Sequence, residues 1–149
     1  MRAGTENTPY IIGLGQAAFL AFKCLDESAD KLSGLRDRLF DRLSAAIPGA
    51  KINGALVERL PNTLSVTFPG VNGLEMLKRI PELCASTGAA CHSDDDASGS
   101  ATLRAMGLSN EEIRGTVRLT VGWYTAQEEV DRAASLLIDA WENLSSVKG

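Results

Sequence analysis

Two short segments with apolar residues at every second position place strands among helices, and so restrict the chain to a mixed fold. The segments are 62–68 and 115–122, and glycine or proline bounds both of them. Period-2 alternation is typical of a strand that buries one of its faces. The residues around them follow a helical period instead. We therefore predict an α+β domain, with a short, mostly antiparallel sheet and helices packed on one face.

The remaining elements are predicted from periodicity and from capping residues. One or two helices are expected between Tyr10 and Leu43, because an apolar stretch is followed by leucines spaced three to four residues apart. Leu74 and Leu77 are expected to face inward from a later helix. The other predicted elements are an edge strand at 51–54, that helix at 71–80, a strand at 83–86, helices at 101–106 and from Ser109, and a final helix from Thr125.

The 149 residues suit a single domain, 1–149, in which two parts are distinguished. Residues 1–47 form a helical segment, and residues 48–149 form a sheet-and-helix core that includes a loop at 86–100. The stretch 11–22 is apolar on most sides, so we expect it to lie between two other layers. Left uncovered, it would form a large apolar patch through which the chain self-associates.

Charge and composition exclude several classes of partner. The net charge is -4, from 15 basic and 19 acidic residues, with no basic block that could follow a row of phosphates, so nucleic acid is not expected. The apolar runs are far shorter than the ~20 residues of a membrane helix, so no membrane span is expected. The first residues lack the apolar stretch of a secretory signal, which predicts a cytoplasmic location.

The three cysteines are predicted to be free thiols, because they form neither a CxxC pair nor an even set. Cys24 and Cys84 occur in apolar surroundings, where cysteine commonly acts as a small buried hydrophobe. Cys91 differs, because it stands in a long stretch of small and acidic residues. That setting favours an accessible thiol that can approach another molecule, over the alternative of a third buried cysteine.

The neighbours of Cys91 leave its chemistry open. His92 is the only histidine, and it could lower the pKa of Cys91 or shuttle a proton, or it could simply be adjacent in sequence without contact. The carboxylates at 94–96 would raise the pKa of the thiol if they lay close to it. A metal site at Cys91, His92 and these aspartates is disfavoured, since hard carboxylates and a soft thiolate seldom share an ion. No metal is predicted.

Arg118 stands inside the predicted strand 115–122, where an arginine is unusual. Two interpretations are open. A carboxylate could pair with its guanidinium through two parallel hydrogen bonds. Alternatively, the side chain points to solvent from the outer face of the strand, and the alternating pattern favours this second interpretation.

Four motifs occur in the order seen in cysteine desulfurases and selenocysteine lyases. They are Arg-Ala-Gly-Thr-Glu-Asn-Thr-Pro at 2–9, Leu-Pro-Asn-Thr at 60–63, Thr-Gly-Ala-Ala-Cys-His-Ser-Asp at 87–94 and Val-Arg-Leu-Thr-Val-Gly at 117–122. From Arg2 to about Asn143 the chain resembles these class-V, fold-type-I enzymes, which depend on pyridoxal phosphate (PLP). Its Cys-His-Ser-Asp form is most similar to the selenocysteine lyase branch and its desulfurase relatives.

The resemblance implies roles for particular residues. Cys91 would take sulfur from PLP-bound L-cysteine as a persulfide and leave alanine, or help to handle selenium from L-selenocysteine. Arg118 would bind the α-carboxylate of the substrate. Thr5 would reach the phosphate of the PLP that the other subunit holds, which implies a homodimer with composite sites. A sulfur or selenium acceptor protein is the implied partner.

The chain also departs from the family pattern. The lysine that binds PLP, the aspartate at the pyridine nitrogen and the histidine stacked on the ring precede the Arg-Ala-Gly-Thr motif, where this sequence starts. The resemblance therefore implies the carboxy-terminal portion of such an enzyme, with residues 1–47 packed on a missing amino-terminal PLP-binding domain. Trp123 stands where the family usually has an arginine. None of the five lysines has the Ser-x-His-Lys context of the family: Lys23, Lys31, Lys51, Lys78 and Lys148.

Two functional hypotheses follow. In the first, the chain is the small carboxy-terminal domain of a cysteine desulfurase or selenocysteine lyase, to which it supplies Cys91 and Arg118. In the alternative, it is a non-catalytic sulfur-carrier or interaction module derived from that domain.

Overall fold

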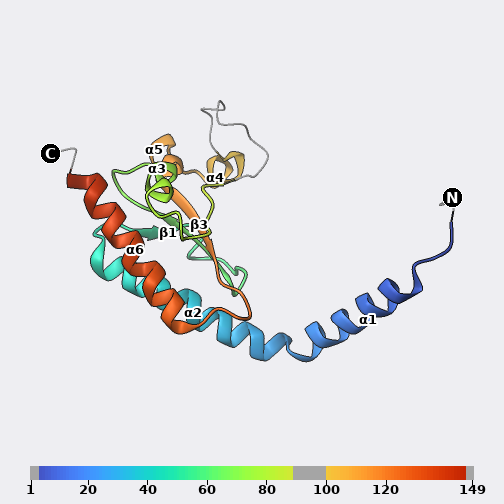
Figure 1. Ribbon diagram of the computed structural model, residues 1–149. Helices are drawn as coiled ribbons and strands as arrows, with labels where there is room; N and C mark the ends of the chain where they lie inside the picture. The colour runs from blue at the N-terminus through green and yellow to red at the C-terminus, as the bar shows by residue number, and fades with distance from the viewer. Residues whose placement is uncertain (1–3, 89–99, 147–149) are drawn as a thin grey trace.

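The computed structural model describes residues 4–88 and 100–146, and it confirms the α+β class (Figure 1). Two long helices come first and a third closes the fold, with the strands and short helices between them. The elements are α1 (Thr8–Lys23), α2 (Leu25–Ala46), β1 (Lys51–Ile52), β2 (Thr63–Thr67), α3 (Gly73–Lys78), α4 (Ala101–Ala105), α5 (Asn110–Arg114), β3 (Thr116–Thr120) and α6 (Gln127–Ser146).

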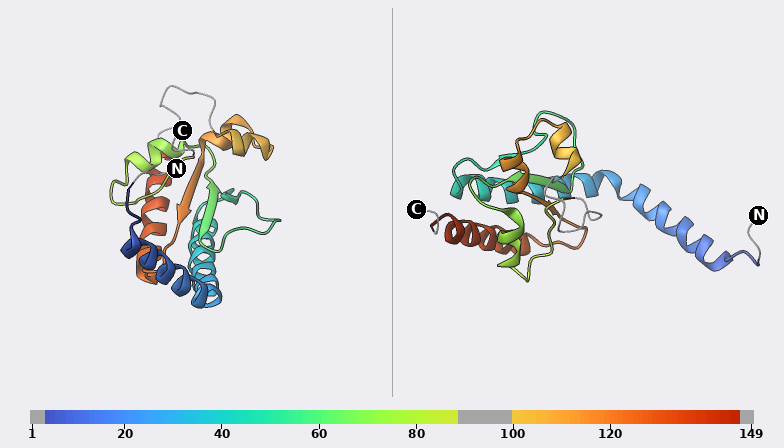
Figure 2. Two further views of the ribbon diagram at one scale, coloured as in Figure 1. Left: turned by 90° about the vertical axis from the view of Figure 1, so that its right-hand side faces the viewer. Right: turned by 90° about the horizontal axis from the view of Figure 1, so that it is seen from above.

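The strands form an antiparallel sheet in the order β1-β2-β3, and α2 and α6 cover one of its faces (Figure 2). The alternation read from the sequence decides which side chains this face receives. Leu64 lies opposite Leu119, and Val66 lies opposite Val117. All four are buried, together with a helical stripe that includes Leu39, Leu43, Val130, Ala134 and Leu137.

Two arginines of α2 contact one aspartate of α6 and so connect the two covering helices. Arg38 of α2 donates two hydrogen bonds of 2.8 Å to the two carboxylate oxygens of Asp131 in α6. Arg42 approaches the same carboxylate at 3.4 Å. The hydrogen bonds from Arg38 lower the pKa of Asp131 and raise that of Arg38. Because these groups are partly exposed to water, they chiefly fix the register of the two helices.

A close approach of the main chain joins the end of β2 to the start of β3. The Phe68 N–H donates to the Gly115 carbonyl at 2.9 Å. A Cβ atom on Gly115 would lie 2.4 Å from the Phe68 carbonyl oxygen, which no side chain tolerates. Glycine at 115 is therefore required by the space between the strands.

The segment after α3 differs from the sequence-based expectation. The predicted strand 83–86 is reduced to one bridge, Ser86 with Arg118, because the chain turns at Ile80 and meets β3 only at Ser86. The predicted inward position of Leu74 is also wrong, since this side chain is 41% exposed and Met76 is buried instead. Asn72 caps α3 by accepting from the Leu74 N–H at 2.9 Å, which starts the helix later than expected.

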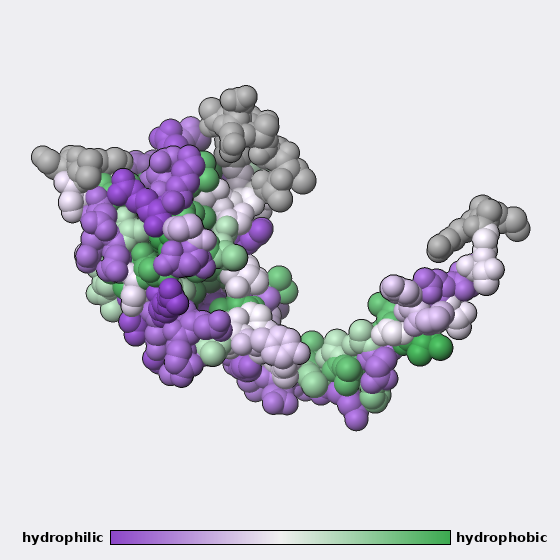
Figure 3. Space-filling model, in the orientation of Figure 1, coloured by the Kyte–Doolittle hydropathy of each residue, from purple (hydrophilic) through white to green (hydrophobic). Residues whose placement is uncertain are grey.

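Helix α1 projects away from the rest of the molecule, and all of its residues are exposed (Figures 1 and 3). Its large apolar side chains include Leu14 and Phe22, which are 72% and 78% exposed. Among the described residues no single helix is long and apolar enough to cross a membrane; only α1 and α2 together, bent by 66° where they meet, reach that length and composition. Nothing in the described chain covers this helix.

We expect the isolated chain to self-associate through α1, because a continuous apolar helix surface of this kind is unfavourable in water. Replacing Leu14 and Phe22 by lysine should shift the sedimentation profile towards the monomer. The matched control is Gln16→Lys, which introduces the same residue type at another exposed position of α1 and removes no apolar side chain. A wild-type chain that sediments as a monomer at every concentration would contradict this expectation.

Candidate functional site

The face of the sheet opposite α2 and α6 is polar, and it places Arg118 at its centre. The side chains that alternate with the core residues pair across the two strands: Thr63 with Thr120, Ser65 with Arg118, and Thr67 with Thr116. Thr67 and Thr116 are buried, whereas Arg118 is exposed. The outward orientation favoured by the sequence pattern is therefore the one that Arg118 adopts.

A hydrogen-bond network fixes one end of this polar face. The hydroxyls of Thr67 and Thr116 lie 2.9 Å apart, and Thr116 Oγ1 also donates to the Glu112 carbonyl at 2.7 Å. Asn53 accepts from Thr67 Oγ1 at 3.1 Å and donates to Ser65 Oγ at 3.1 Å. The network connects Asn53, which follows β1, and Glu112 of α5 to strands β2 and β3. Arg118 lies on β3.

Glu112 joins this network through its carbonyl, and its side chain is held in the ionised form. The hydrogen bond from Lys51 and that from the Ser109 N–H, 2.7 Å long, lower the pKa of Glu112 from 4.5 to about 2. Ionised Glu112 therefore favours the folded state above about pH 4.5, and this contribution disappears as the pH falls towards 2. The Ser109 and Glu112 pair is a capping box that starts α5.

The main chain of Arg118 is fastened to the segment that leads towards Cys91. Arg118 N–H donates to the Ser86 carbonyl at 2.6 Å, and Ser86 N–H donates to the Arg118 carbonyl at 3.2 Å. No carboxylate in residues 4–88 or 100–146 forms an ion pair with the Arg118 guanidinium. The guanidinium borders a pocket of about 300 Å³, which Ser65, Thr102, Met106 and Thr116 help to line.

The residues on either side of 89–99 meet beside this pocket. Ser86 Oγ donates to the Gly88 carbonyl at 3.0 Å and accepts from the Gly88 N–H at 3.3 Å, which shapes a turn where Gly88 takes a φ of +152°. A Cβ atom on Gly88 would lie 3.7 Å from the Cβ of Ser100. Ser100 in turn caps α4 by accepting from the Leu103 N–H.

Several predicted site residues fall outside the described part of the chain. These are Cys91 and His92, with the aspartates at 94–96 that entered the alternative metal site. Thr5 is described and exposed; it precedes α1, at the end of that helix remote from the sheet (Figure 1). Thr5 and Arg118 are therefore not brought together within one chain. Among the described residues, no group of three or more acidic, histidine or cysteine side chains could hold a metal ion.

The structure corrects the prediction for the other two cysteines. Cys84 is exposed and Cys24 is half-buried, where both were expected in the core. Cys24 lies at the break between α1 and α2, and Cys84 lies where the chain diverges from β3. Cys84 lines a second, open pocket together with Ser86, Arg118 and Thr120. The sequence analysis missed this thiol because its position depends on a strand that does not form.

Trp123, the departure from the family pattern, follows β3, the strand that carries Arg118, by three residues. Lys31 Nζ donates to the Trp123 carbonyl at 2.6 Å and lies 5.2 Å from the centre of its ring. Such a cation–π contact connects the segment after β3 to α2. The residue thus has a structural contact on this chain, although its side chain remains 40% exposed.

Comparison with known proteins gives consistent family matches. The family model described as Aminotransferase class-V matches residues 1–133. A cysteine desulfurase of Nostoc sp. is 38% identical over 148 residues, which are 98% of this chain and 37% of that protein. Cysteine desulfurase IscS 1 of Archaeoglobus fulgidus is 38% identical over 99% of this chain and 38% of its own length. The chain thus spans little more than a third of the length of the curated relatives it matches.

Solved structures support the same fold. A structure titled NifS-like protein aligns with a TM-score of 0.74 and 32% identity, over 97% of this chain and 35% of that one. The X-ray structure of a NifS-like protein from Rickettsia africae ESF-5 aligns with a TM-score of 0.74 and 27% identity, over 97% of this chain and 36% of that one. The α+β arrangement described above is therefore a known one.

The buried network should contribute measurably to stability. Thr116→Val removes the hydroxyl that links the buried Thr67 hydroxyl to the Glu112 carbonyl, so each of these groups loses one hydrogen-bond partner and we expect a loss of about 1–3 kcal/mol in the free energy of unfolding. Thr120→Val is the matched control, since this threonine on the same strand and face is exposed, and should change the value by less than about 0.5 kcal/mol. Urea unfolding followed by circular dichroism measures both. Equal effects would contradict a stabilising role for the network.

Proposed function

Because the chain belongs to the class-V aminotransferase family, we propose that it supplies one part of the active site of a cysteine desulfurase. L-cysteine is the substrate, Arg118 binds its α-carboxylate, and Cys91 accepts its sulfur. The choice of L-cysteine over L-selenocysteine rests on the relatives, which are named cysteine desulfurases and match nearly the whole chain. A sulfur acceptor protein and a cytoplasmic location belong to the same proposal.

One observation carries the proposal: the pair of hydrogen bonds between Ser86 and Arg118, 2.6 and 3.2 Å long. Through this bridge, the segment that leads to Cys91 starts beside the arginine. Gly88 lines the same pocket as Arg118. Three residues of extended chain reach at most about 11 Å, so Cys91 cannot lie farther than this from Gly88. A thiol within that range can meet a small amino acid bound at the arginine.

Arg118 suits a carboxylate ligand for physical reasons. Its guanidinium is exposed on a fixed strand, and within the described residues it is not neutralised by an acidic side chain. The planar fork of donors matches the two oxygens of a carboxylate. The pocket beside Arg118 is lined by Ser65, Thr102 and Thr116 together with the apolar Leu103 and Met106, so it offers contacts to both the polar and the aliphatic parts of a small amino acid.

The transfer to Cys91 is balanced without an external oxidant. The Cβ–S bond of L-cysteine breaks and a bond forms between that sulfur and Cys91 Sγ, so the thiol becomes a persulfide. The two sulfur atoms are oxidised together by two electrons, and the substrate Cβ is reduced to the methyl group of alanine. All hydrogen atoms are retained between the two products. A histidine next to the thiol, His92, is the candidate for proton movement at Sγ.

The described residues do not fit the aldehyde of PLP, which needs a lysine amine. No lysine lines the pocket at Arg118. The four described lysines contact other groups: Lys23 the Phe19 ring, Lys31 the Trp123 carbonyl, Lys51 Glu112, and Lys78 Glu75. We assign no step of the reaction to the cofactor on this chain. PLP and its lysine belong, in this proposal, to the polypeptide that makes up the rest of the relatives' length.

The position of Thr5 agrees with this division. Thr5 precedes the projecting helix α1, far from the Arg118 of its own chain (Figure 1). A contact between Thr5 and a PLP phosphate would therefore serve a different site from the one that Arg118 serves. That is the arrangement a homodimer with composite sites requires.

The test is a chimera in which this chain replaces the 148 residues that it matches in the Nostoc cysteine desulfurase. We expect the chimera to form alanine from L-cysteine in the presence of PLP, and Cys91→Ser to abolish this. Arg118→Ala should raise KM for L-cysteine by about 10- to 100-fold, because a charge-assisted contact with the carboxylate is lost. The matched control is Arg114→Ala, an exposed arginine on α5 outside the pocket.

A folded chimera that binds PLP but forms no alanine would contradict the proposal, as would an unchanged KM in Arg118→Ala. L-selenocysteine is assayed in parallel, and a strong preference for it would reassign the substrate. Sulfur acquired by the isolated chain from the intact Nostoc enzyme, without alanine formation by the chimera, would favour the sulfur-carrier alternative.

A further inference from the structure

Ser65 of β2 lies directly beside Arg118 on the polar face of the sheet. The two residues are partners in the register of β2 and β3. The Val121 N–H donates to the Asn62 carbonyl, and every second pair from there is hydrogen-bonded in the same way. This alternation leaves Ser65 and Arg118 as a pair without main-chain bonds between them. The side chains of such a pair approach closely, with Cβ atoms about 4.5–5.5 Å apart.

The main chain holds both residues of this pair from their outer sides. The Ser65 carbonyl accepts from the Asn53 N–H at 2.9 Å, and Arg118 exchanges its two hydrogen bonds with Ser86. Neither residue can therefore move away from the other without breaking bonds of the sheet. Ser65 is half-buried, and it lines the pocket of about 300 Å³ together with Arg118.

The Ser65 hydroxyl accepts a hydrogen bond but donates none within the described part of the chain. Asn53 Nδ2 donates to Ser65 Oγ at 3.1 Å, which occupies one lone pair of that oxygen. No described acceptor takes the Ser65 O–H. The neighbouring hydroxyls do have acceptors, since Thr67 donates to Asn53 Oδ1 and Thr116 donates to the Glu112 carbonyl. Ser65 thus keeps an available donor at the wall of the pocket.

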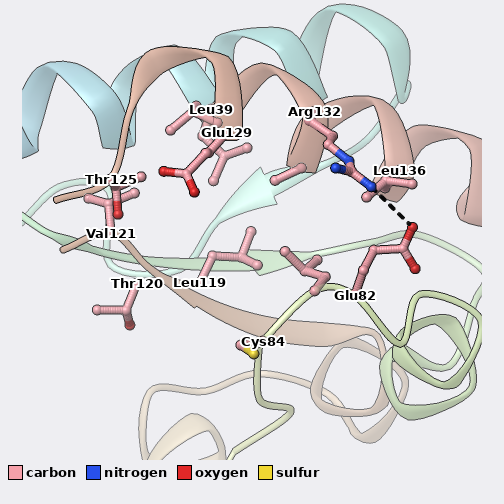
Figure 4. Close-up of a pocket in the computed structure, with 13 residues that line it drawn as sticks. Leu39, Glu82, Cys84, Leu119, Thr120, Val121, Thr125, Glu129, Arg132 and Leu136 are labelled. Carbon is pink, nitrogen blue, oxygen red and sulfur yellow. Dashed lines mark ion pairs between the residues drawn. The ribbon is translucent and has the colours of Figure 1, made fainter.

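A second pocket also contains an arginine, but it suits an anion less well. This pocket, of about 360 Å³, lies between α2 and α6 on one side and the end of β3 on the other (Figure 4). Its Arg132 lies 3.9 Å from Glu82, and Glu129 lines the same pocket. Two carboxylates near one guanidinium oppose the entry of a third. Of these two pockets, the one that Arg118 and Ser65 line is therefore the better anion site.

We propose that Ser65 is a second substrate-binding residue, whose hydroxyl donates to the α-carboxylate that Arg118 binds. This inference rests on the proposed function and adds one residue to it. A carboxylate can accept about four hydrogen bonds, and the planar fork of Arg118 supplies two of them. The Ser65 O–H supplies a third from the neighbouring strand. A contact from this second direction fixes the orientation of the carboxylate, which the guanidinium alone leaves free to tilt.

The first test measures KM in the chimera with the Nostoc desulfurase. Ser65→Ala removes only the hydroxyl, so KM for L-cysteine should rise about 10-fold, because a hydrogen bond to a charged group is lost. Since this contact is made equally before and during the reaction, kcat should stay within about 2-fold. The matched control is Thr63→Val, which removes a hydroxyl from the same strand and face outside this pocket.

The outcome separates this inference from the proposed function. An unchanged KM in Ser65→Ala, in a chimera whose KM does respond to Arg118→Ala, would overturn the role of Ser65 and leave the proposed function intact. An equal rise of KM in Thr63→Val would also overturn it, because the effect would then belong to the strand and not to the pocket.

A double variant tests whether the two residues bind the same group. In the Arg118→Ala background the carboxylate is no longer held in place, so Ser65→Ala should raise KM by less than about 3-fold. Fully additive effects of the two substitutions would show that Ser65 acts at another group, and would overturn the proposal.

Inhibitors identify the group that Ser65 contacts. L-Serine carries the carboxylate, whereas L-serinamide carries an uncharged amide in its place. Ser65→Ala should weaken inhibition by L-serine about 10-fold and inhibition by L-serinamide by less than about 3-fold. Equal losses with both inhibitors would assign Ser65 to another part of the amino acid and overturn the proposal.

The isolated chain allows a measurement that does not depend on the chimera. L-Serine should shift the Arg118 side-chain Nε–H signal in the NMR spectrum, and Ser65→Ala should raise the dissociation constant about 3- to 10-fold. A shift with equal dissociation constants would overturn the role of Ser65 alone. No shift at Arg118 in the folded chain would contradict the carboxylate site, and this inference with it.

Discussion

The register between β2 and β3 is the constraint on which the rest of the structure depends. It places Leu64 and Val66 against Leu119 and Val117 under the helices, and it places Arg118 opposite Ser65 on the other face. A slip of one residue would exchange the two faces, burying the arginine and exposing the core. Gly115 helps to prevent such a slip, because only glycine allows the close approach to Phe68.

The candidate site follows directly from that register. The strand holds Arg118, its main chain holds Ser86, and the Ser86 turn leads to the segment that contains Cys91. Two thiols are relevant to this site: Cys91, which follows this turn in the sequence, and Cys84, which is exposed and lines an open pocket with Arg118. The proposed chemistry assigns the sulfur to Cys91, and Cys84 is its physical competitor.

Local patterns predicted the elements whose position depends on their own sequence. The alternation at 62–68 and 115–122 was sufficient for β2 and β3, and the leucine spacing was sufficient for α2, because one buried face decides each element. The same reasoning failed for 83–86, where pairing depends on a turn at Ile80 that no periodicity shows. It failed likewise for Leu74, since Met76 is the buried side chain of α3, and for Cys84, whose exposure follows from the missing strand. For Arg118, the pattern indicated the outward face, but only the structure shows that Ser86 lies beside it.

The measurement that tests the account most directly follows one sulfur atom from the substrate to the protein. The chimera is incubated with L-cysteine carrying a heavy sulfur isotope, trapped with an alkylating reagent, and digested for mass spectrometry. Cys84 and Cys91 fall on one peptide, so fragment ions of that peptide locate the label. The account predicts the labelled sulfur as a persulfide on Cys91, and none on Cys24 or Cys84. Label on Cys84, or alanine release with no label on Cys91, would contradict it.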